Sequence, residues 1–152
     1  LNHVFGLHNY YPTLVNGTGV APFKTLRNYD DNLSRHDDYI AFLDRAIGRF
    51  RQGMKNGVFE TRLTVGIMVS QLDTQIATPI ADTPFMGPVQ NFPADFTEAD
   101  KARLTAAYDA KTREIIAATT RLRDFLRDEY LPVARASIGL SQMKGGDRLY
   151  AY

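Results

Sequence analysis

The sequence predicts an all-α fold, a bundle-like array of helices with one long helix over about residues 97–131. Two long stretches carry apolar residues at three- and four-residue steps, which is the spacing of one helix face. Between them, a proline-rich connector over residues 78–96 holds four of the seven prolines. We expect one domain over residues 1–152, because a chain of this size can bury its own core.

Residues 1–24 are expected to form an irregular lead-in that lies over a core built by the rest of the chain. Asn9-Tyr10-Tyr11-Pro12 and Asn16-Gly17-Thr18-Gly19 are turn-forming stretches. The apolar residues of this segment follow no sustained period, which also favours an irregular path.

Residues 25–56 are predicted to be helical. Asn56-Gly57 is typical of a helix end, because both residues tolerate the left-handed conformation. The stretch is long for one helix, and Ser34 is placed to cap a second helix after a short break. The apolar face consists of Tyr39, Ile40, Leu43, Ala46, Ile47, Phe50 and Met54.

Residues 61–77 fit two patterns. An alternation typical of a strand involves Leu63, Val65, Ile67 and Val69. The helical spacing extends over more residues, and a lone strand would have no partner to pair with in a helical chain. The prediction is therefore a helix.

The connector over residues 78–96 is too rich in proline for a regular helix, because proline lacks a backbone donor. Loops of this length are uncommon in compact domains and are often functional. Its apolar residues predict that it is pinned to an apolar surface; they are Phe85, Met86, Val89, Phe92 and Phe96.

The segment Thr97-Glu98-Ala99-Asp100 opens the long helix with a threonine cap and acids in the first turn. Pro132 is expected to bend or end it. At about 1.5 Å per residue, residues 97–131 would span about 50 Å and overhang a compact domain. We expect a kink, or a cover over the apolar stripe from the remainder of a longer chain or a second copy. A well-packed, self-contained fold with no exposed stripe on residues 97–131 would count strongly against the chain being a fragment of a larger protein.

The composition excludes several classes of protein. The chain has 18 basic and 17 acidic residues, and nucleic-acid binding usually requires a basic excess. The arginine clusters over residues 45–51 and 121–127 are expected to be solvated helix faces. Without cysteine, thiol catalysis, disulfides and cysteine-based zinc sites are excluded. No apolar run approaches the roughly 18 residues that span a bilayer.

The sequence shows no complete catalytic or metal site. A helical zinc-peptidase site needs two histidines on one helix face with a glutamate beside the first. The three histidines, His3, His8 and His36, lack this spacing. Three pairs of carboxylates are expected to be structural: Asp30-Asp31, Asp37-Asp38 and Asp128-Glu129. No catalytic or metal-binding residue is therefore predicted.

One loop is a candidate for ligand contact. Gly145-Gly146 would expose backbone donors to an anion, and Arg148 and Tyr150 follow closely. The alternative is an ordinary turn into the next helix.

The second half of the chain resembles a known family. Residues 125–135, FLRDEYLPVAR, precede Gly139-Leu140, Gly145-Gly146 and Tyr150, and this order is similar to the bacterial family called domain of unknown function 885. Supporting similarities are Gly53 with Gly57, residues 65–72, and Thr83-Pro84-Phe85. The resemblance touches most of residues 25–152.

The resemblance implies a function that the residues alone do not. Members of this family are largely helical proteins of several hundred residues, many exported or lipoprotein-like, and they look like zinc-dependent peptidases with a His-Glu segment in the C-terminal half. Nothing here matches that segment, so no catalytic residue is carried over, and zinc is expected in the parent protein only. The compartment stays open, with the periplasm or export favoured by the family.

The resulting expectation is a non-catalytic helical portion of a larger zinc-metallopeptidase-like hydrolase. It would flank the substrate cleft and contact the remainder of the parent chain and a peptide substrate. The alternative is a self-contained helical protein-interaction module with no enzymatic activity.

Overall fold

The computed structural model describes residues 4, 6–19 and 23–136, and its secondary structure there is helical apart from one isolated bridge between Thr61 and Arg135. The all-α prediction is therefore confirmed. In chain order the elements are α1 (Leu7–Leu14), α2 (Leu26–Lys55), α3 (Arg62–Ala77), η1 (Ile80–Asp82), η2 (Pro84–Val89), α4 (Glu98–Asp124), η3 (Phe125–Tyr130) and η4 (Leu131–Val133).

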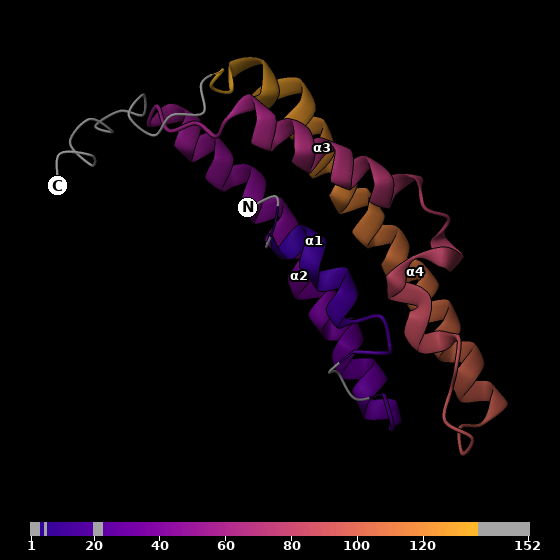
Figure 1. Ribbon diagram of the computed structural model, residues 1–152. Helices are drawn as coiled ribbons and strands as arrows, with labels where there is room; N and C mark the ends of the chain where they lie inside the picture. The colour runs from indigo at the N-terminus through magenta and orange to yellow at the C-terminus, as the bar shows by residue number, and fades with distance from the viewer. Residues whose placement is uncertain (1–3, 5, 20–22, 137–152) are drawn as a thin grey trace, which may run out of the picture.

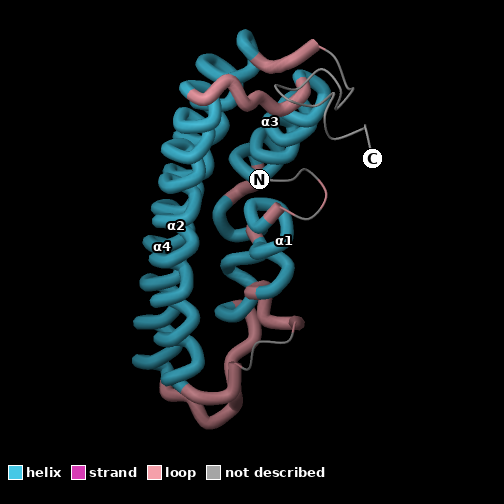
Figure 2. The backbone as a smooth tube through the Cα atoms, turned by 90° about the vertical axis from the view of Figure 1, so that its left-hand side faces the viewer, coloured by secondary structure: helices cyan, strands magenta, loops and turns pink. Residues whose placement is uncertain are grey.

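The helices form an elongated array in two layers. Helices α2 and α4 run in the same direction (Figure 1). Helix α3, which lies between them in the sequence, runs in the opposite direction. The first layer is the α2–α4 pair, and α1, α3 and the connector form the second layer (Figure 2). Within the described part of the chain, no helix combines the length and the apolar character needed to cross a membrane.

Helix α2 is continuous, so the break proposed before Ser34 is wrong. The cap is Thr25, whose side chain accepts from the backbone N–H of Asn28, while the Asn28 side chain accepts from the backbone N–H of Thr25. Ser34 lies inside the helix and donates to the carbonyl of Asp30. The predicted stop is confirmed, because Gly57 has a φ of 73° and adopts the left-handed conformation.

The prediction that residues 1–24 are irregular is wrong at Leu7–Leu14, which form helix α1. Pro12 lies inside this helix, where its missing N–H leaves the carbonyl of His8 without its helical partner. Two side chains from elsewhere in the chain replace that donor: Tyr39 Oη at 3.2 Å and Gln75 Nε2 at 3.0 Å. Tertiary hydrogen bonds therefore stabilise a helix that the local sequence disfavours.

The predictions for α3 and the connector are confirmed. Thr61 caps α3 by accepting from the N–H of Thr64. The connector folds into η1 and η2, and its Phe85, Met86 and Phe96 are buried. The hydroxyl of Tyr29 donates to the carbonyl of Pro88 at 3.1 Å, which fastens the connector to α2.

The long helix is also confirmed. The Thr97 cap is present, and α4, η3 and η4 form one helix of 36 residues that ends after Pro132. Most of its large apolar side chains are covered from within the chain by α2, α3 and the connector, and Val133 near its end is exposed. The fully buried ones include Leu104, Tyr108, Ile115, Leu122 and Leu126. The apolar stripe therefore needs no partner to cover it.

Ion pairs hold α2 and α4 in register. On α2 they involve a residue at every seventh position, which is the repeat of two helices that run parallel at a small angle. Each pair is partly exposed and contributes at most about 1 kcal/mol, so the pairs set alignment more than stability. They are Asp30 with Arg103, Asp37 with Lys111, Asp44 with Arg121, and Arg51 with Glu129.

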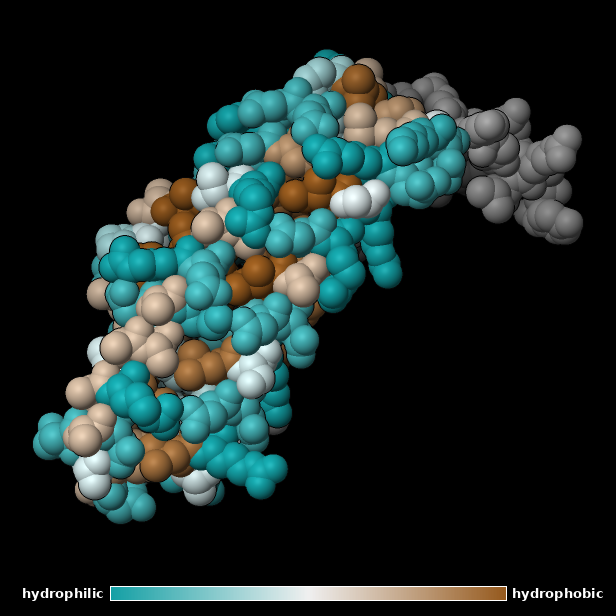
Figure 3. All heavy atoms as spheres, turned by 180° about the vertical axis from the view of Figure 1, so that it is seen from behind, coloured by the Kyte–Doolittle hydropathy of each residue, from teal (hydrophilic) through white to brown (hydrophobic). Residues whose placement is uncertain are grey.

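Polar residues cover most of the face that Figure 3 shows, and the apolar ones on it are scattered.

Candidate functional site

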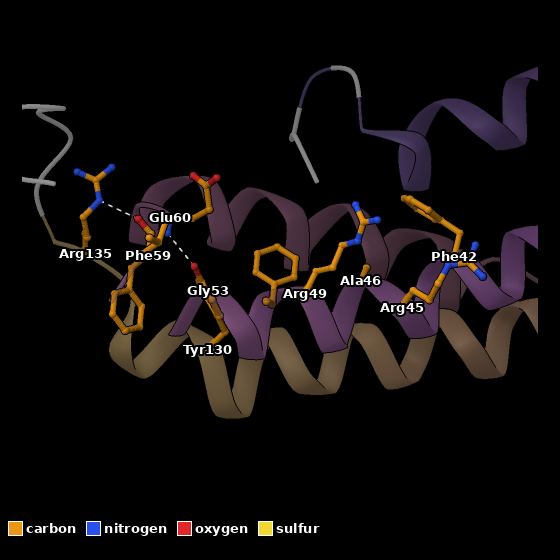
Figure 4. A pocket seen from close by; sticks show the side chains of 11 residues that line it. Phe42, Arg45, Ala46, Arg49, Gly53, Phe59, Glu60, Tyr130 and Arg135 are labelled. Carbon is orange, nitrogen blue, oxygen red and sulfur yellow. Dashed lines mark hydrogen bonds between the residues drawn. The ribbon is translucent and has the colours of Figure 1, made fainter. Parts of the chain in front are cut away.

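A groove of about 540 Å³ lies along the second half of α2 and continues to the end of the long helix. Its volume is in the range that holds a small molecule or a short peptide. The lining residues are Phe42, Arg45, Ala46, Arg49, Phe50, Gly53, Val58, Phe59, Glu60, Tyr130 and Arg135. Figure 4 shows Phe42 at one end of the groove and Phe59 with Arg135 at the other.

One face of α2 supplies the floor. Its six lining residues span positions 42 to 53 at three- and four-residue steps, so they all point to the same side of the helix. Phe42, Ala46 and Phe50 make this floor apolar. At Gly53 a side chain would approach the carbonyl oxygen of Val58 at 3.2 Å, so glycine lets the following loop pass close to α2.

The opposite wall is the loop after α2, and four hydrogen bonds hold it in place. The N–H of Glu60 donates to Tyr130 Oη at 2.7 Å. The N–H of Arg135 donates to the Glu60 carbonyl at 3.0 Å, and Arg135 Nε donates to the Phe59 carbonyl at 3.0 Å. The N–H of Arg62 completes the bridge by donating to the Arg135 carbonyl. These hydrogen bonds fix the backbone of the wall relative to the end of the long helix.

The π-helical segment η3 directs Tyr130 toward this wall. In an α-helix, residues five apart point about 140° away from each other, because each residue turns the chain by about 100°. The wider π-turn brings them onto nearly the same side. Accordingly, the rings of Phe125 and Tyr130 lie 6.2 Å apart and are both buried. Burial also raises the pKa of the Tyr130 hydroxyl, which keeps it neutral.

The charge of the groove is positive. Three arginines and one glutamate line it, which gives the lining a formal charge of +2. Arg45 and Arg49 are exposed, lie one turn apart on α2, and make no ion pair with any described residue. The other arginines that cluster with them in the sequence behave differently: Arg51, Arg121, Arg123 and Arg127 all bind carboxylates.

The histidines are structural within the described residues. His8 is buried, and its Nε2 lies 3.3 Å from Gln71 Oε1. His36 is also buried, and its Nδ1 lies 2.8 Å from Tyr11 Oη. Burial lowers the pKa of both rings, and that of His36 falls to about 4 with a further contribution from Lys111. His3 lies outside the described residues.

The described residues do not fit a zinc ion, since no three of their histidines, aspartates and glutamates lie together as a metal site. Each pair of neighbouring carboxylates considered above forms at least one ion pair with a basic side chain. Asp30, Asp31, Asp128 and Glu129 pair with arginines, and Asp37 pairs with a lysine. The candidate ligand contacts Gly145, Gly146, Arg148 and Tyr150 lie outside the described residues.

The groove was not predicted from the sequence. Arg45 and Arg49 were expected on a solvated helix face, and both are exposed. The available signal was their four-residue spacing, interleaved with Phe42 and Phe50 on the same face. The remaining lining comes from residues 58–60, 130 and 135, which only the tertiary fold brings to α2.

Comparison with known families matches the whole chain, residues 1–152, to DUF885, which is described as a bacterial protein of unknown function. The comparisons with curated proteins and with solved structures gave no match.

Proposed function

Because the chain belongs to the DUF885 family of bacterial proteins, we propose that it is the non-catalytic helical portion of a larger zinc-metallopeptidase-like hydrolase. In this role its two helical layers form a wall beside the substrate cleft. The zinc and the residues that bind it belong to the parent protein, and no described residue takes part in the chemistry.

The observation that carries this proposal is the groove along α2. An apolar floor with arginines at its edge is suited to a peptide, whose apolar side chains pack on the floor and whose polar groups remain near the rim. The floor stands on a continuous helix and the wall is fixed through Tyr130 and Arg135. Because this surface is already rigid, binding a substrate costs little conformational entropy of the protein.

The buried stripe on the long helix favours the second candidate function, a self-contained helical interaction module. Leu104, Ile115 and Leu122 are fully buried inside the described chain, so no parent protein is needed to cover them. This removes one reason for expecting a larger assembly around α4. The groove would then bind a partner protein, with no hydrolysis.

The full-length protein made from the complete reading frame tests the proposal. We expect it to contain zinc and to cleave peptides, to lose cleavage when a chelator removes the metal, and to regain it with added zinc. A photo-reactive phenylalanine analogue in place of Phe42 should crosslink to substrate peptides. The same analogue at Ala102, an exposed position on α4 outside the groove, should not.

The two candidates give different results. A full-length protein that cleaves no peptide and holds no zinc would overturn the hydrolase proposal. A reading frame that ends near Tyr152, together with a partner protein bound at the groove, would favour the interaction module.

A further inference from the structure

We propose that the groove along α2 binds a peptide segment that carries two acidic side chains around an aromatic or aliphatic one. This inference deepens the proposed function and rests on it, because it names the class of substrate segment that the helical wall would hold. Three features of the groove support it: two arginines, Arg45 and Arg49, without an ion pair to any described residue, an apolar floor, and a volume that fits a few residues.

Arg45 and Arg49 take no part in the ion pairs that join α2 to the long helix. Four ion pairs join these helices, such as Asp44 with Arg121 and Glu129 with Arg51. Arg45 and Arg49 lie on the same helix, yet no acidic side chain of the described residues comes within ion-pair distance. Two like charges one turn apart on a helix are mildly destabilising, so the fold gains nothing from this pair.

The apolar floor distinguishes this site from a plain basic patch. Phe42, Phe50 and Phe59 are only partly buried and face the groove beside Arg45 and Arg49. A guanidinium beside an apolar, partly desolvated surface binds a carboxylate more strongly than one in open water. A ligand that pairs a carboxylate with an apolar group therefore uses both features.

The charge balance favours acidic side chains over a single C-terminal carboxylate. Arg45 and Arg49 place two positive charges on the groove, and the described residues supply no ion-pair partner for either. A single carboxylate would bind the guanidinium of either Arg45 or Arg49 and leave the other positive charge in the groove without a partner from the ligand. Two carboxylates on a short peptide would pair with both arginines, and a volume of about 540 Å³ accommodates a few residues.

Binding of labelled peptides to the full chain provides the test. The probe is an amidated pentapeptide with the sequence Gly-Glu-Phe-Glu-Gly that carries an uncharged fluorophore on its N-terminus, and its binding is followed by fluorescence anisotropy at low and at physiological salt. The double variant Arg45→Gln/Arg49→Gln should raise the Kd by about tenfold or more, as expected for two charge-assisted contacts. The matched control Arg35→Gln removes an exposed arginine of α2 outside the groove and should change the Kd by less than about twofold.

Peptide variants separate the sources of the carboxylate. Replacing both glutamates by glutamine should abolish binding to the wild-type protein, and replacing phenylalanine by glycine should weaken it. If the glutamine peptide binds as well once its C-terminus is a free acid, the groove recognises a chain end and the proposal is wrong. These peptide substitutions are all measured with the wild-type protein, so they still test the proposal if the double variant fails to fold.

Two further outcomes would overturn the inference. Equal binding of the acidic peptide by wild type and the double variant would place the site elsewhere. Self-association that the double variant abolishes, without peptide binding, would identify a second copy as the occupant. Failure of the proposed function is a separate result: peptide binding at the groove would persist in a full-length protein that shows no zinc-dependent cleavage.

Discussion

Tyr11 Oη and His36 Nδ1 lie 2.8 Å apart in the interior and join α1 to the middle of α2. Both side chains are buried, and the ring of Tyr11 also stacks on Tyr39 at 4.2 Å. His36 Nε2 has no hydrogen-bond partner among the described residues. A neutral ring tolerates this environment, whereas a charged ring would require a second acceptor.

This contact predicts that acid destabilises the fold. Burial, with the nearby charge of Lys111, lowers the pKa of His36 from 6.5 to about 4. Between these values the unfolded chain binds a proton that the folded chain excludes, so the free energy of unfolding falls as the pH drops from about 6.5 to about 4. The loss from this group reaches about 3 kcal/mol. Urea denaturation at several pH values measures it.

His36→Gln provides the comparison, because glutamine can accept from Tyr11 and does not titrate. Its stability should depend less on pH than that of the wild type over the same range. His8→Gln reports the contribution of the second buried histidine, whose pKa is also lowered by burial. Parallel pH profiles for wild type and His36→Gln would contradict the assignment.

The close approach of the first loop to the connector gives a second prediction. A Cβ added to Gly87 would overlap the carbonyl oxygen and the carbonyl carbon of Asn16, which belong to the backbone and cannot rotate away as a side chain could. We expect Gly87→Ala to lower the free energy of unfolding by more than about 2 kcal/mol, because the loop or η2 must shift. The measurement is equilibrium denaturation in urea.

Gly48→Ala is the matched substitution. A Cβ at Gly48 meets no atom within 4 Å, and the residue is exposed inside α2. Alanine there should stabilise the protein by about 0.5–1 kcal/mol, because glycine loses more backbone entropy in a helix. Destabilisation of similar size at both positions would mean that the contact with Asn16 is not what matters at Gly87.

The helix boundaries that the sequence predicted correctly depend on local chemistry. Thr97 and the acids after it form an N-terminal cap, and Asn56-Gly57 provides a left-handed stop; both act within a few residues. Neighbouring residues alone suffice to identify such signals. Helix α1 was missed because its stability depends on donors 31 and 67 residues away, on Tyr39 and Gln75.

The groove illustrates the same limit. The α2 side of the groove, including Arg45 and Arg49, was readable as one helix face. The opposite wall depends on the π-turn that points Tyr130 toward Glu60, and on the bridge between Thr61 and Arg135. Helical periodicity assumes a constant number of residues per turn, so it places Tyr130 about a third of a turn from its actual direction.

The cap of the long helix supports a third prediction. The Thr97 side chain accepts from the N–H of Asp100 and donates to its carboxylate. Thr97→Ala should cost about 1 kcal/mol of stability. Thr105→Ala removes the same atoms from an exposed position inside α4, where alanine is the better helix former, and should be neutral or stabilising. Thermal denaturation of both variants decides this, and equal losses would contradict the capping role.

The wall of the groove gives the last prediction. Tyr130→Phe removes the acceptor for the N–H of Glu60 and keeps the buried ring, so we expect a loss of about 1 kcal/mol in stability. Because Glu60 and Phe59 lie on the same loop, a looser wall should also weaken binding of the acidic peptide. The control is Tyr10→Phe, at an exposed tyrosine outside the groove, which should change neither quantity measurably. If Tyr130→Phe lowers stability while the Kd for the peptide stays the same, this hydrogen bond stabilises the fold without shaping the groove.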